Sequence, residues 1–135
     1  MTLTFQVPGT PVQQGSKRGF SRKGSTFVQI VDDNKAKLKP WRATVREHAA
    51  NALGNGTGFT DACFVLLDFH MPRPKSVRRA RPSVKPDIDK LTRALLDGLT
   101  DSGVLKDDAL VVSLHVEEWY ADGDPFVNVR VGELA

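Results

Sequence analysis

Residues 85–112 read KPDIDKLTRALLDGLTDSGVLKDDALVV and decide the expected fold. Within this stretch Leu91, Leu95 and Leu99 recur at steps of four, which places them on one face of an α-helix. We therefore predict a helix from about Ile88 to Leu99, followed by a glycine turn. Acidic residues stand directly before this helix and again after the turn, so the same stretch carries the candidate chemistry.

Four further stretches predict strands. Residues 2–7 alternate apolar and polar side chains, and so do residues 112–116 and 127–131, as expected for strands with one buried face. Residues 62–70, ACFVLLDFH, are almost all apolar, which is typical of a strand buried on both faces. We expect this strand at the centre of a sheet, and we expect the stretch 112–116 to be a core strand as well.

A second helix is expected from about Pro40 to Leu53. Trp41, Val45 and Ala49 recur at helical spacing, with a proline near the start and a glycine just past the end. Strands and helices in this order predict a single α+β domain over residues 1–135. It should contain a mixed β-sheet of about four strands with two main helices packed on it.

The charges are strongly polarised along the chain. The sequence of 135 residues has 19 Lys and Arg against 16 Asp and Glu, a formal net charge of +3. Residues 1–93 hold 17 of the basic and 7 of the acidic residues, a net charge of +10, whereas residues 94–135 hold 2 and 9, a net charge of −7. A basic body of this size suits a polyanion, because each neutralised phosphate releases counterions. The alternative is that charges of both signs only solvate a small domain.

Two loops carry many of the basic side chains. The first, residues 15–25, is rich in Gly, Ser, Lys and Arg, and we expect a mobile loop or a weak hairpin that returns through Phe27, Val28 and Ile30. The second, residues 71–86, is rich in proline, and we expect it to be irregular. We predict that these loops bind DNA phosphates through Lys17, Arg18, Arg22, Lys23, Arg73, Lys75, Arg78, Arg79, Arg81 and Lys85.

Several classes of protein are excluded. Cys63 is the only cysteine, so a disulfide framework and a four-cysteine zinc site are ruled out, and its apolar strand leaves the thiol inert. No stretch approaches the ~20 apolar residues that cross a bilayer, so we expect no membrane partner and a cytoplasmic protein. Residues 19–25 have the glycine spacing of a phosphate loop, but Ser25 stands where that motif needs its lysine, so no nucleotide cofactor is expected.

Two pairs of aspartates flank the helix predicted between them. Pro86 imposes an extended backbone in which Asp87 and Asp89 project to the same side, so their carboxylates can converge on one ion. A second pair, Asp107 and Asp108, follows the turn, and the returning chain could bring one of them near Asp89. Carboxylates without a nearby His or Cys suit Mg²⁺ or Mn²⁺. The alternative is that the first pair caps the helix and the second occupies a turn.

The residue types and their spacing in this segment form a recognisable signature. They read Asp87-Ile88-Asp89-Lys90-Leu91-Thr92-Arg93, then Asp97-Gly98-Leu99, Gly103 and Asp107-Asp108-Ala109-Leu110-Val111. This resembles the RusA family of Holliday junction resolvases, whose signature is D-[LI]-D-N-L-x-K-x-x-x-D-A-L, a glycine turn and D-D-x-x-V. The likeness covers most of the chain, because the length, the first strand, the basic segment and the late strands also fit.

What the resemblance implies is a crossover junction endodeoxyribonuclease, a phosphodiester hydrolase of DNA recombination and repair. Members of the family act as homodimers that bind four-way junction DNA and cut two strands symmetrically with Mg²⁺. The resemblance also implies a phage or prophage source, and therefore action in the cytoplasm of a bacterial host. Carried over residue by residue, the metal-binding carboxylates are Asp87, Asp89 and Asp108.

The sequence departs from the family signature at two positions. Lys90 stands where the family has asparagine, and Arg93 stands where the family has a lysine that contributes to cleavage. Arginine keeps the positive charge and can clamp a phosphate, but it cannot donate a proton as lysine can. Lys90 lies three residues earlier on the predicted helix, so it is a neighbouring alternative for the same role.

The expected function is therefore a Mg²⁺-dependent endonuclease that resolves Holliday junctions and other branched DNA. Its catalytic residues would be Asp87, Asp89, Asp108, Arg93 and Lys90, with Mn²⁺ as a second possible metal. Two other hypotheses stay open. The first is a non-catalytic module that binds branched DNA, in which the acidic residues serve only folding and binding survives EDTA. The second is a metal-dependent nuclease that acts on other DNA structures.

Overall fold

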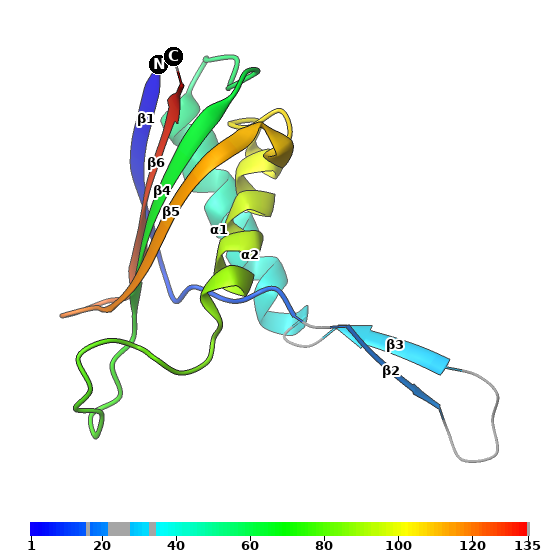
Figure 1. Ribbon diagram of the computed structural model, residues 1–135, viewed down its shortest axis with the longest axis vertical. Helices are drawn as coiled ribbons and strands as arrows, with labels where there is room; N and C mark the ends of the chain where they lie inside the picture. Colours follow the sequence, from blue (N-terminus) through cyan, green and yellow to red (C-terminus); the bar gives the residue numbers. More distant parts are fainter. Residues whose placement is uncertain (16, 22–27, 33–34, 135) are drawn as a thin grey trace.

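The fold is built on one mixed sheet of four strands. In their order across the sheet these are β1 (Thr2–Pro8), β6 (Phe126–Glu133), β4 (Cys63–Met71) and β5 (Val111–Tyr120). β6 pairs antiparallel with both β1 and β4, whereas β4 and β5 are parallel (Figure 1). The computed structural model describes residues 1–15, 17–21, 28–32 and 35–134. The predicted α+β domain with a mixed four-stranded sheet is confirmed.

A separate two-stranded sheet follows β1 in the chain. β2 (Lys17–Ser21) pairs antiparallel with β3 (Val28–Asp32). The structure therefore contains the predicted hairpin, with its return through Val28 and Ile30. The connection between its strands, which includes Phe27, lies outside the described residues. The second basic loop contains no helix or strand beyond Met71, the last residue of β4, as predicted.

Two helices, α1 (Lys35–Leu53) and α2 (Ile88–Ser102), cover the same face of the sheet (Figure 1). α1 begins five residues before its predicted start. Leu38 explains the extension, because it adds one more buried position to the apolar stripe of Trp41 and Val45. Pro40 consequently lies inside the helix, where it removes only one backbone hydrogen bond near the N-terminus.

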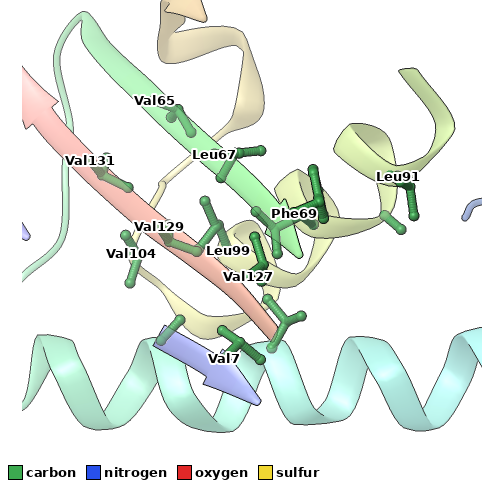
Figure 2. Packing of buried hydrophobic residues seen from close by; sticks show 14 of the residues in the cluster. Val7, Val65, Leu67, Phe69, Leu91, Leu99, Val104, Val127, Val129 and Val131 are labelled. Atoms are coloured by element: carbon green, nitrogen blue, oxygen red, sulfur yellow. The ribbon is translucent and has the colours of Figure 1, made fainter. Parts of the chain in front are cut away.

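The hydrophobic core lies between the helices and this face of the sheet. α2 contributes the predicted stripe of Leu91, Leu95 and Leu99, all fully buried. Alternate residues of two strands point toward the helices because the side chains of a strand alternate between its faces. Figure 2 shows these side chains together: Val65, Leu67 and Phe69 of β4 and Val127, Val129 and Val131 of β6, none more than 1% exposed.

The strand predictions need two corrections. β4 is central, as predicted, but only its helix-facing side is fully buried, and Leu66 on the other side is 37% exposed. The prediction of a core strand at residues 112–116 is wrong. β5 lies at an edge of the sheet with a neighbour on one side only, and this leaves Val112 64% exposed and Leu114 48% exposed.

The crossover from β4 through α2 to β5 positions the candidate site. Two parallel strands require a connection that carries the chain back along the sheet, so α2 runs opposite to both strands (Figure 1). The start of α2 therefore lies at the carboxyl ends of β4 and β5. Its end lies near the start of β5, which the short helix η1 (Asp108–Leu110) precedes. Among the described helices, none has the length and apolarity needed to cross a membrane.

Candidate active site and nucleic-acid interface

Asp87 stands directly before α2 and does not use its carboxylate to cap the helix. Its backbone is extended, with φ −73° and ψ 137°, and its side chain makes no capping hydrogen bond. Instead its backbone N–H donates to Gln13 Oε1 at 3.0 Å. Lys90, one turn later, places Nζ 3.7 Å from Asp87 Oδ2. Because the Asp87 side chain is 45% exposed, its carboxylate is available to a ligand.

Glu118 brings a second carboxylate to Asp87. It lies near the end of β5 in register with Phe69 of β4, so it points toward the helices. Burial is the main cause that raises the pKa of Glu118 to about 7; the negative charge of Asp87 adds to the rise and Arg81 opposes it. Glu118 Oε2 is buried without a hydrogen-bond partner among the described residues.

Sequence reasoning missed Glu118, although the sequence contained a signal for it. Glu118 continues the alternation of Val112, Leu114 and Val116 along β5, so it lies on the apolar side of the strand. A carboxylate at such a position costs free energy unless a partner or a function retains it. The prediction followed the acidic pairs beside the helix and did not extend the alternation to the strand end.

A pocket of about 560 Å³ adjoins these two carboxylates. Residues 81–88 form one side of it, and residues 116–118 at the end of β5 form the other. Its lining combines apolar side chains, such as Val84 and Ile88, with charged groups of both signs. The pocket is open to solvent, so it is a shallow depression and not an enclosed cavity.

We call residues 72–86 the basic segment, and its six predicted DNA-binding side chains divide into two groups. Arg73 and Arg81 make contacts within the protein: Arg73 lies over the ring of Tyr120 and Arg81 over that of Trp119. The other four are exposed and make no side-chain hydrogen bond or ion pair with any residue in the described part of the chain. These four are Lys75, Arg78, Arg79 and Lys85.

The four cations predicted in the first basic loop are not placed by the structure. Arg22 and Lys23 lie outside the described residues. Lys17 and Arg18 belong to β2, for which the backbone alone is described. Their role in binding DNA stays a prediction.

The two residues of the second acidic pair have different roles: Asp107 caps a helix, and Asp108 is exposed to solvent. Asp107 accepts a hydrogen bond from the backbone N–H of Ala109 at 2.9 Å and so caps η1, as the turn alternative expected. Asp108 is exposed, and its negative charge helps to raise the pKa of Asp97, after burial as the main cause. Asp108 therefore lies beside the C-terminal half of α2.

Asp87 and Asp108 lie toward opposite ends of α2, whose 15 residues span about 22 Å. In the part of the chain that the structure describes, no group of three His, Cys, Asp or Glu side chains could hold a metal ion. Asp89 is exposed on the first turn of α2 next to Asp87. In a single chain the acidic residues therefore occupy two separate positions: Asp87 and Asp89 at the start of α2, and Asp108 near its end.

Arg93 and Lys90 face different neighbours. Lys90 lies 3.7 Å from Asp87, at the pocket end of α2. Arg93 is exposed one turn further along. Burial is the main cause that raises the pKa of Asp97, and the charges of Arg42 and, more weakly, Arg93 oppose this rise. Asp97 also lies 4.0 Å from Arg42 of α1, so it joins the two helices.

Comparison with known proteins shows the family of this chain. The chain matches the family described as Endodeoxyribonuclease RusA over residues 8–132. It is also similar to the uncharacterized protein YqaN of Bacillus subtilis (strain 168), with 31% identity over an alignment that covers 98% of this chain and 97% of that protein. The match runs from the last residue of β1 into β6 and includes both acidic positions and the basic segment. The chain therefore belongs to the RusA family of endodeoxyribonucleases.

Proposed function

We propose that this protein is a Mg²⁺-dependent Holliday junction resolvase that acts as a homodimer and cuts two strands of a four-way DNA junction symmetrically. Family membership supports endonuclease activity on DNA. The observation that carries the proposal is the Asp87 carboxylate, which makes no capping hydrogen bond with α2. It lines a pocket that is also lined by residues of the basic segment. We further propose a role in DNA recombination and repair in the cytoplasm of a bacterial host.

The residues at the start of α2 fit a Mg²⁺ ion. Mg²⁺ is usually held by one or two carboxylates and keeps its remaining positions for water and substrate phosphate. Asp87 and Asp89 would supply those two carboxylates, since neither caps the helix with its side chain in a described hydrogen bond. When bound, Mg²⁺ would polarise the phosphodiester and lower the pKa of the attacking water.

The protein's own cations would orient the DNA. Lys75, Arg78, Arg79 and Lys85 of the basic segment are free to contact phosphates, which would fix the register of the backbone over the pocket. Lys90 lies beside Asp87 and would stabilise negative charge on the reacting phosphate. Specificity for junctions would then come from the shape of the dimer and the deformability of branched DNA.

A homodimer would also bring the two acidic positions together. β5 is an edge strand of ten residues with exposed apolar side chains at Val112 and Leu114. Antiparallel pairing of two copies along this edge would set the start of one β5 beside the end of the other. Asp108 of one copy would then approach Asp87 and Asp89 of the other, and each dimer would contain two such sites.

The direct test incubates purified protein with a labelled four-way junction or a linear duplex, in Mg²⁺ or EDTA. We expect paired nicks on the junction alone, in Mg²⁺ alone. Asp89→Asn should abolish cutting and keep junction binding, whereas Asp61→Asn, an exposed aspartate before β4, should behave as the wild type. Binding without cutting in any divalent metal would favour the non-catalytic module. Cutting of other DNA structures at equal rates would favour a less specific nuclease.

A further inference from the structure

We propose that Arg81 is a positioning residue that anchors the basic segment to the end of β5, and that it does not itself bind DNA phosphate. This inference rests on the proposed function, because it concerns how the protein presents its cations to DNA. It assigns Arg81 a role different from that of its neighbours Arg78 and Arg79 in the same segment.

The guanidinium of Arg81 is engaged on one face and two of its edges. Its carbon atom lies 3.6 Å from the centroid of the Trp119 ring, a stacked cation–π contact. Its Nε donates to the backbone carbonyl of Glu118 at 2.6 Å, and Nη2 donates to Glu117 Oε1 at 3.3 Å. A phosphate would have to displace these contacts, and the planar guanidinium is suited to keeping all three at once.

Arg73 makes a matching anchor at the start of the segment. It lies 4.2 Å from the centroid of the Tyr120 ring, and its Nη1 donates to the carbonyls of Val77 at 3.3 Å and Arg79 at 2.8 Å. Trp119 and Tyr120 are consecutive residues of one strand, so their side chains point to opposite faces of the sheet. The two arginines therefore hold the end of β5 from both faces.

The anchor matters to the site because Arg81 is part of the pocket wall. Residues 81–88 face residues 116–118 across the pocket that adjoins Asp87, and the contacts of Arg81 join these two sides directly. Release of Arg81 would free the irregular segment at that wall. The backbone that carries the other four cations would then be less ordered, and DNA binding would have to order it again at an entropic cost.

Charge-conserving variants separate anchoring from phosphate binding. Arg81→Lys keeps the charge but loses the stacking plane and the two directed donors, and Trp119→Leu removes only the ring. We expect both variants to bind a four-way junction in EDTA about three- to tenfold more weakly, and the double variant to be no weaker than either one. Trp119→Phe should restore binding, and Arg46→Lys on α1, also exposed, should have no effect.

Trypsin cleavage without DNA tests the anchor independently of the proposed function. Pro82 follows position 81, so Arg81→Lys adds no new cleavable bond, and cutting is expected after Lys75, Arg78 and Arg79. We expect Arg81→Lys and Trp119→Leu to speed this cutting and Trp119→Phe to leave it unchanged. Unchanged cutting in both variants would overturn the anchor. If Arg81→Lys and Trp119→Leu bind the junction as tightly as the wild type, the anchor has no role in DNA binding. If the wild type itself does not bind DNA, that result contradicts the proposed function and leaves the trypsin test of the anchor in place.

Discussion

Lys90 and Arg93 are both candidates for the cation that assists cleavage, and the structure distinguishes them. Lys90 Nζ lies 3.7 Å from Asp87 Oδ2, whereas Arg93 acts on Asp97 further along α2. Because a positioned donor beside the reacting phosphate typically contributes about 100-fold or more to a rate, Lys90→Ala should lower the junction cleavage rate about 100-fold. Arg93→Ala should lower it less than about fivefold.

Single-turnover cleavage at saturating protein measures these two effects, with junction affinity in EDTA as the control for binding. Lys90→Arg keeps the charge and should retain most of the rate. A larger loss in Arg93→Ala than in Lys90→Ala would contradict this assignment and would favour the position that the family signature suggests.

Glu118 should make the protein less stable at neutral pH than in mild acid. Its folded pKa of about 7 lies above the ordinary value of 4.5, because burial penalises the charged form. The folded state therefore binds more protons than the unfolded state between pH 4.5 and 7, and the free energy of unfolding falls as the pH rises through this range. The contribution is about 1 kcal/mol, because the side chain is only partly buried and solvent screens its charge.

Thermal unfolding in EDTA at pH 5 and pH 8 measures this dependence. Glu118→Gln should flatten the change in Tm between the two pH values and raise the Tm at pH 8 by a few degrees. Glu133→Gln replaces an exposed glutamate at the end of β6 and serves as the control. Identical pH profiles for Glu118→Gln and the wild type would show that this carboxyl is not the titrating group.

Individual site residues were predictable where the signal is local. Asp87 and Asp89 stand at the start of a helix and Asp107 and Asp108 follow its end, and the two pairs together, next to the basic residues, indicated a site. Glu118 and the anchoring role of Arg81 could not be predicted in the same way. Both depend on the proximity of the segment before α2 to the end of β5, about 30 residues later in the chain, which is created only by the crossover.

The close packing of α1 against α2 predicts that a methyl group added at their contact lowers the stability of the fold. A Cβ on Gly98 of α2 would lie 2.6 Å from Cγ1 of Val45 of α1. Gly98→Ala should therefore destabilise the protein by about 1–3 kcal/mol, although alanine has the better helix propensity. Chemical denaturation measures the change, with Gly123→Ala as the control because a Cβ there meets no atom within 4 Å. A more stable Gly98→Ala variant would show that the helices can move apart at no cost.

The elements were predictable in kind, and their errors have physical causes. The spacing of the leucines predicted both the buried face of α2 and its start at Ile88, because helical periodicity is a local property of the sequence. α1 starts before its predicted boundary because proline near the start of a helical pattern indicates a helix start, whereas burial of Leu38 extends the helix past Pro40. The exposure of β5 could not be predicted from its alternation, since the order of strands in a sheet is set by long-range pairing.

The proposed dimer, in which each site combines acidic positions from two copies, predicts complementation between inactive variants. Asp89→Asn and Asp108→Asn should each abolish cutting. If Asp108 of one copy completes the site at Asp89 of the other, a heterodimer of these two variants contains one intact site and should nick one strand of a junction. A heterodimer of Asp87→Asn with Asp89→Asn contains no intact site and should stay inactive.

Heterodimers isolated through two different affinity tags provide this test. The same arrangement predicts that Leu114→Asp, at an exposed position of the β5 edge, gives a monomer by light scattering and lowers cutting at least about tenfold. Equal inactivity of both heterodimers, or a dimeric and active Leu114→Asp variant, would contradict the pairing along β5.

The whole molecule is proposed to make two coordinated cuts at a four-way junction, and a supercoiled plasmid that extrudes a cruciform measures this directly. Two symmetric cuts across the cruciform give a linear product, a single cut gives an open circle, and binding alone leaves the plasmid supercoiled. We predict linear product in Mg²⁺, and unchanged plasmid in EDTA or with Asp89→Asn. Plasmid that stays supercoiled in Mg²⁺ and in Mn²⁺, while the protein binds the cruciform, would contradict the proposed resolvase.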